Sequence, residues 1–213
     1  MELPPLPTLT NEQQEDRVIV HDLAQRLMAM ELGFGTGQIS VGMSFGLPSS
    51  LSKNRSKASG KLNSATDVAA HLRKRIMVLS AGVIGEVHWF HKLLGFDMEN
   101  GHVESIYQNG VIDGATLTDK DKIQELLIIL CGIEREPSGN YQLLEEQKLE
   151  IFGEIYQQST RIFDSFSEKL FILANLTISE RWSNRGLSVS GERLAELETK
   201  AETLLIKSLS TCE

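Results

Sequence analysis

The sequence feature that most constrains the fold is a long periodic segment in the second half of the chain, residues 143–181. Its apolar residues recur at spacings near 3 and 4, or at their sum of 7, as they do on one face of an α-helix. The segment therefore predicts one long helix in a mainly helical protein. The residues that carry the repeat are Phe152, Ile155, Ile162, Phe166, Leu170 and Leu173.

Capping residues and apolar periodicity predict four further helices. Ser64 and Thr118 are each followed three residues later by an aspartate, a pattern typical of a helix N-terminus. Gly33 is expected to end the first helix. The connections are expected in segments rich in Gly, Asn, Ser or Pro. The predicted helices are 11–32, about 64–94, one opening at Thr118 and one capped by Ser190, with an irregular connection at 95–115, a mobile loop at 53–61 and a turn at 136–140.

A short segment near the front of the chain alternates with the period of a β-strand. In residues 38–46, Ile39, Val41, Met43 and Phe45 point one way, and small or polar residues point the other. The expected fold class is mainly α (α+β), a helical domain with a small β element near its N-terminus. We expect residues 1–10 to be an extended tail and residues 11–213 to form a single domain.

Composition argues against several classes of protein. Lys and Arg total 21 against 29 acidic residues, and the net charge of −8 disfavours binding to a phosphate backbone. Cys131 and Cys212 are isolated in the sequence, so no disulfide framework is expected. No signal peptide and no stretch of about 18 apolar residues is recognisable, so we expect no membrane segment and a cytoplasmic location.

One short motif carries chemical information. The segment 17–25 contains His21-Asp22-x-x-Gln25, which is related to the H-E-x-x-H motif of zincin peptidases. In that motif the two histidines share a helix face and bind Zn²⁺, while the glutamate polarises the metal-bound water and carries its proton. Here one histidine is present, the acid is one methylene shorter, and the second ligand is an amide.

The order of the segments that follow gives the motif more weight. After it come the strand at 38–46, a helix with a small-residue patch at 75–86, and Gly114 to Asp119. This series resembles the peptidase domain of FtsH-type zinc metalloproteases, whose corresponding motifs are L-L-G-G-R-x-A-E-E and T-G-A-x-x-D-L. The likeness covers residues 14–195, with 88–113 as a probable insertion and two extra residues before Asp119.

The resemblance implies a role for each matching residue. His21 and Asp119 would be metal ligands, Asp22 stands at the general-base position, and Gln25 replaces a ligand histidine. A peptide partner would dock on the strand of Ile39, Val41 and Met43 by β-augmentation. No cofactor is expected except zinc, which a weakened ligand set would hold poorly. The chain has no G-x-x-x-x-G-K-[ST], so ATP hydrolysis is not expected.

Other interpretations stay open at this point. Asp119 could be a helix N-terminal charge, Glu86 a hydrogen-bonding residue, and His88 with His91 a relocated metal pair. The leading hypothesis is a pseudoprotease that binds a peptide or protein partner. The alternatives are an active ATP-independent metallopeptidase with an unusual ligand set, and a regulatory subunit of a proteolytic system. The long helix from Leu143 could also serve a homo-oligomer.

Overall fold

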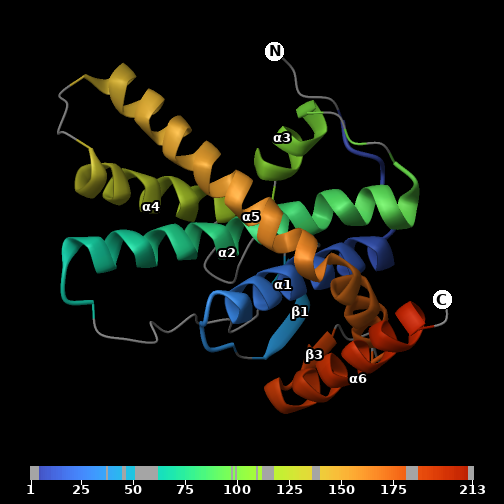
Figure 1. The fold of residues 1–213 in the computed structure, drawn as a ribbon. Helices are drawn as coiled ribbons and strands as arrows, with labels where there is room; N and C mark the ends of the chain where they lie inside the picture. Colours follow the sequence, from blue (N-terminus) through green and yellow to red (C-terminus); the bar gives the residue numbers. More distant parts are fainter. Residues whose placement is uncertain are drawn as a thin grey trace.

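A computed structural model of the chain describes residues 5–36, 38–44, 47–50, 62–96, 98, 100–108, 110–111, 118–135, 140–180 and 187–210. These residues form six helices and three short strands (Figure 1), so the prediction of a mainly helical fold with a small β element is confirmed. None of the described helices is long and apolar enough to cross a membrane. The elements are α1 (Asn11–Glu31), β1 (Ile39–Ser44), β2 (Leu47–Ser50), α2 (Ala65–Leu94), α3 (Asn100–Gln108), α4 (Asp119–Glu134), α5 (Tyr141–Ile178), β3 (Leu187–Val189) and α6 (Gly191–Ser210).

Helices α1 and α2 form the centre of the molecule. They run antiparallel, and the long helix α5 crosses both of them (Figure 1). Gly82 and Gly85 of α2 let the central pair approach closely. A Cβ on Gly85 would lie 2.7 Å from the Cβ of Ala24, and a Cβ on Gly82 would meet the His21 ring. One continuous cluster of buried apolar residues joins the helices, and its largest members include Trp89, Phe90 and Phe163.

Polar side chains fix the helix starts. The Ser64 hydroxyl accepts a hydrogen bond from the backbone N–H of Asp67 at 3.1 Å, as predicted. Thr118 and Asp121 form a complete capping box, because each side chain accepts from the backbone N–H of the other residue. These caps set the first turn of α4, and thereby place Asp119 as its first residue.

The three strands form one antiparallel sheet in the order β2-β1-β3. The middle strand is β1, the one that sequence alternation predicts. Val41 pairs with Ser50 of β2 on one side and with Leu187 of β3 on the other. The outer edges of the described sheet therefore belong to β2 and β3.

Two elements differ from the sequence expectation. Residues 95–115 are not irregular throughout, because α3 occupies 100–108 within them. Its nine residues are too few for periodicity to separate them from a Gly- and Asn-rich loop. Strand β2 was also not expected, since Leu47–Ser50 holds a proline. The expected loop at 53–61, most of the turn at 136–140 and residues 114–117 before Asp119 lie outside the described residues.

Candidate functional site

The three residues at the zincin-like positions converge on one point. His21 and Gln25 lie one turn apart on α1, and Asp119 begins α4. The Nε2 atom of His21 lies 2.9 Å from Oδ2 of Asp119, and the Gln25 amide nitrogen donates to the same oxygen at 2.5 Å. The structure thus brings together residues separated by about a hundred positions in the sequence, and does so with direct contacts.

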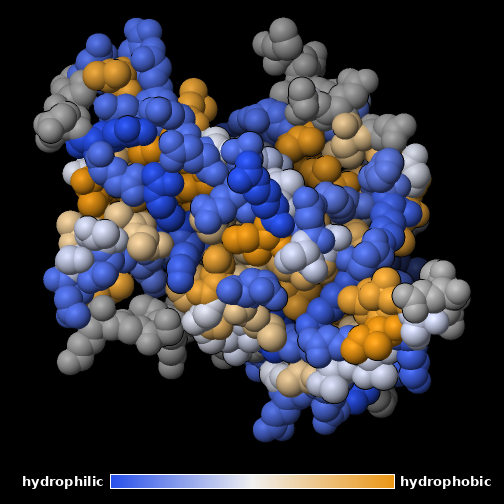
Figure 2. All heavy atoms as spheres, in the orientation of Figure 1, coloured by the Kyte–Doolittle hydropathy of each residue, from blue (hydrophilic) through white to orange (hydrophobic). Residues whose placement is uncertain are grey.

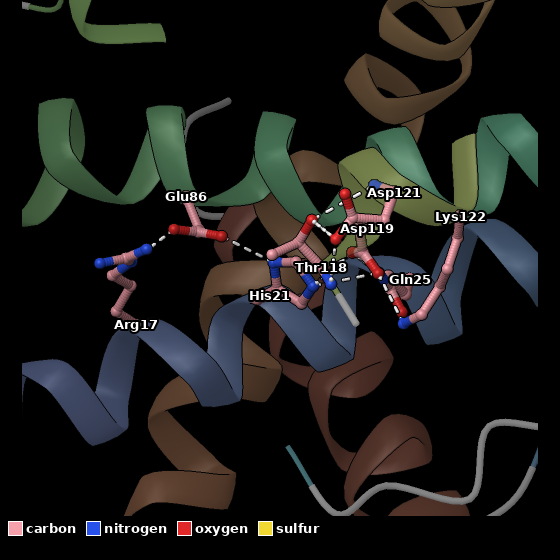
Figure 3. Close-up of polar contacts among 8 residues, drawn as sticks. All are labelled: Arg17, His21, Gln25, Glu86, Thr118, Asp119, Asp121 and Lys122. Atoms are coloured by element: carbon pink, nitrogen blue, oxygen red, sulfur yellow. Dashed lines mark hydrogen bonds and ion pairs between the residues drawn. The ribbon is translucent and has the colours of Figure 1, made fainter. Parts of the chain in front are cut away.

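The other side of the His21 ring is also occupied. Its Nδ1 lies 2.7 Å from Oε1 of Glu86 on α2, and Glu86 in turn is paired with Arg17 of α1. At the opposite end, Lys122 donates to Oδ1 of Asp119 at 3.1 Å. Figure 3 shows these groups as a row that links three helices. The order along this charge network is Arg17, Glu86, His21, Asp119 and Lys122, with Gln25 beside His21.

The network sets the protonation state of each buried member. Burial alone would lower the pKa of His21, but the hydrogen bonds and charges of Asp119 and Glu86 outweigh burial and raise that pKa to about 10. Burial opposes ionisation of both acids, yet Arg17 and His21 hold the pKa of Glu86 below its usual range. His21 and Lys122 do the same for Asp119. Positive and negative charges therefore alternate along the row at neutral pH.

A glycine makes room for the imidazole. A Cβ placed on Gly82 of α2 would lie 2.4 Å from Cε1 of His21, which is closer than any real contact. The small-residue patch expected in this helix therefore has a specific use, since it allows α2 to pass directly over the ring. His21 itself is only 2% exposed.

The resemblance implies zinc, and the geometry of these side chains does not fit it. Two ligand atoms about 2.0–2.1 Å from one zinc ion in tetrahedral geometry would lie about 3.3 Å apart. The separations among the His21, Gln25 and Asp119 atoms are 2.9, 3.0 and 2.5 Å, so these atoms contact each other directly. Both ring nitrogens of His21 face carboxylates, and the Gln25 amide nitrogen donates to Asp119.

The remaining predicted residues are placed as follows. Asp22 is buried at 2% exposure on α1. On β1, the Ile39 side chain is fully buried, Val41 pairs with a strand on each side, and Met43 pairs with Pro48 of β2. The ring of His88 lies 4.9 Å from that of Phe163, and burial lowers its pKa. Within the described residues, no three or more His, Cys, Asp and Glu side chains could hold a metal ion.

Sequence reasoning missed some members of the site. Arg17, His21 and Gln25 recur every four residues on one face of α1, a spacing that could have identified Arg17 as a member. Lys122 follows Asp119 by three residues on α4, where i,i+3 pairs face each other. A second buried ion pair, Arg26 with Glu198 at 2.5 Å, joins α1 to α6 and has no local sequence signal.

No known protein-family model matches the chain, and no curated protein sequence is detectably similar to it. The site is therefore defined by its own contacts. It consists of a buried, internally paired charge network that joins α1, α2 and α4.

Proposed function

We propose that the chain is an FtsH-peptidase-like pseudoprotease, a scaffold without peptidase chemistry that binds a peptide or protein partner. The observation that carries the proposal is the position of Gln25. Its amide lies against both His21 and Asp119, where a second ligand histidine would stand in a zincin. Convergence of these three residues supports descent from such a site, and their chemistry supports the loss of its activity.

The contacts explain why catalysis would fail here. A zincin needs an imidazole lone pair and a carboxylate oxygen as metal ligands, besides a separate carboxylate that takes a proton from bound water. Both nitrogens of His21 are engaged with carboxylates, and Asp119 accepts from His21, Gln25 and Lys122. The same groups tie α1, α2 and α4 together, so the former catalytic positions serve the stability of the scaffold.

A partner would dock on the sheet. Because β1 lies in the middle, an added strand would pair with an outer edge, at β2 or β3, instead of with β1 itself. The backbone groups on such an edge offer hydrogen bonds to any extended peptide, which suits a module that recognises unfolded segments.

Metal analysis tests the loss of zinc binding. The wild-type protein, purified without chelator, is expected to hold far less than one zinc per chain by plasma mass spectrometry. The Gln25→His variant restores an imidazole and should take up more zinc than the wild type. Gln157→His, which adds a histidine at an exposed position of α5, is the matched control and should not.

Casein tests the binding role. Fluorescently labelled unfolded casein should bind the wild-type protein by anisotropy and remain intact on gels, with or without EDTA. Stoichiometric zinc in the wild type, together with casein cleavage that His21→Ala abolishes, would overturn the proposal. If the protein does not bind unfolded casein, the part of the proposal that concerns partner binding is wrong.

A further inference from the structure

A separate cavity lies on the other side of α4 from the charge network. Its volume is about 350 Å³, which is within the range of small-molecule sites in proteins. Helices α2, α3, α4 and α5 all contribute to it, and α3 belongs to the segment without a counterpart in the FtsH-type resemblance. The lining residues used below are Glu104, Tyr107, Lys120, Lys148, Leu149 and Phe152.

One wall of the cavity is aromatic. The rings of Tyr107 and Phe152 lie 5.6 Å apart, and the rings of Phe152 and Tyr156 lie 5.9 Å apart, each pair at a tilted angle. All three residues line the cavity. Such a wall favours a flat, unsaturated ligand that can make stacked or edge contacts.

The polar groups of the cavity favour an anion. Lys148 is buried, and its ammonium is held by Glu145 at 2.7 Å and by the Gln124 amide oxygen at 3.1 Å. Lys120 is partly buried and donates to a neutral acceptor, the amide oxygen of Gln108. Glu104 also lines the cavity but is exposed, and the charges of Glu104, Asp119 and Asp121 all reach the Tyr107 hydroxyl. Among the lining lysines, Lys148 is paired with a carboxylate and Lys120 with a neutral amide, so Lys120 is the cation that an anionic ligand would meet.

One buried polar atom lacks a partner. The Tyr107 hydroxyl makes no hydrogen bond of normal geometry within the described part of the chain, although a weaker hydrogen-bonding interaction with the Gln124 side chain lowers its pKa. Burial raises that pKa to about 12, so the group stays a neutral donor at neutral pH. A buried hydroxyl without a partner is costly, and an acceptor brought by a ligand would remove that cost.

We propose that this cavity binds an aromatic carboxylate, with the ring against Tyr107 and Phe152 and the carboxylate at Lys120 and the Tyr107 hydroxyl. Hydrophobic side chains are visible at the surface over α3 and the middle of α5 (Figure 2). Two sources share this chemistry, a free aromatic acid and the C-terminal aromatic residue of a polypeptide. The cavity shares no lining residue with the charge network, and the proposal does not rest on the function proposed above.

Calorimetric titration with defined probes tests the site. We expect 2-naphthoate to bind the wild-type protein with a dissociation constant below 1 mM, and about tenfold more tightly than 2-naphthamide or cyclohexanecarboxylate. Lys120→Gln and Tyr107→Phe should each raise the dissociation constant of 2-naphthoate by about tenfold, as expected for the loss of a hydrogen bond to a charged group. Lys92→Gln, a surface lysine paired with Glu168, is the matched control and should bind like the wild type.

A blocking variant keeps the test decisive if a polar variant misfolds. Leu149 lines the cavity yet is 70% exposed, so it lies at the rim, and Leu149→Trp should abolish binding without disturbing the core. Leu209→Trp, at a 67% exposed position of α6, is the control. No binding of 2-naphthoate, or equal binding by Leu149→Trp, would overturn the proposal.

The peptide arm separates the two sources. Acetyl-Ala-Ala-Phe with a free carboxylate is compared with its C-terminal amide and with 2-naphthoate. Tighter binding of the free peptide than of 2-naphthoate supports the site with a polypeptide C-terminus as its ligand, and the reverse order supports it with a small acid. Equal binding of the peptide and its amide would contradict the role of Lys120.

Discussion

The two faces of α4 contain polar groups in opposite situations. On one face, Asp119 joins a row of buried charges in which each described member contacts its neighbours. On the other, Lys120 lines a cavity that also holds a buried hydroxyl without a hydrogen bond among the described residues. Residues that are adjacent in sequence thus serve two different purposes. The paired charges of the network stabilise the fold, whereas the polar groups of the cavity can still bind a ligand.

The largest expected effect comes from removing Glu86, the acid that lies between Arg17 and His21 in the network. Glu86→Ala leaves the buried charges of Arg17 and His21 without their shared partner. Breaking a buried pair in this way costs about 3–5 kcal/mol in the free energy of unfolding. Urea unfolding followed by circular dichroism measures the loss. Glu168→Ala, which removes an exposed surface partner of Lys92, is the control, and an equal loss in both variants would show that the network is not structural.

The second prediction concerns pH. The pKa of His21 is raised from about 6.5 in the unfolded chain to about 10 in the folded protein, so protonated His21 stabilises the fold. That contribution is complete below pH 6.5 and is lost as the pH rises through about 10. The wild type should lose about 1.4 kcal/mol per pH unit across this window relative to His21→Gln. Ring ¹⁵N shifts of His21 that titrate near pH 6.5 would contradict the expectation.

The sequence predicts the fold more readily than the site. Apolar periodicity and caps such as Thr118 are local features, and they located five of the six described helices. The contact of His21 with Glu86 joins residues 65 positions apart, and its strength depends on burial, which no local pattern reports. The resemblance predicts that Gln25 stands in place of a ligand histidine, and this stays a prediction. The sequence could not show that the amide would bond to Asp119 and so complete a different structure.

The third prediction tests the close packing that closes the network. Gly82→Ala would place a methyl group against the His21 ring, and overpacking of this kind costs about 1–3 kcal/mol. Gly153→Ala in α5 is the matched control, because a Cβ there meets no atom within 4 Å. Since alanine is the better helix former, that control should be stabilised by about 0.5–1 kcal/mol. Shifts of the urea midpoint in the same direction for both variants would contradict the role of Gly82.

The smallest effect distinguishes the cavity from the network most directly. Tyr107→Phe removes only a hydroxyl that is buried without a hydrogen bond among the described residues. Because no bond is lost and a desolvated polar group disappears, the free energy of unfolding should stay the same or rise by up to about 1 kcal/mol. In the charge network, removing a polar group is expected to lower the free energy of unfolding instead. A loss of stability in Tyr107→Phe would mean that the hydroxyl already has a partner, and the cavity would then be a closed site like its neighbour across α4.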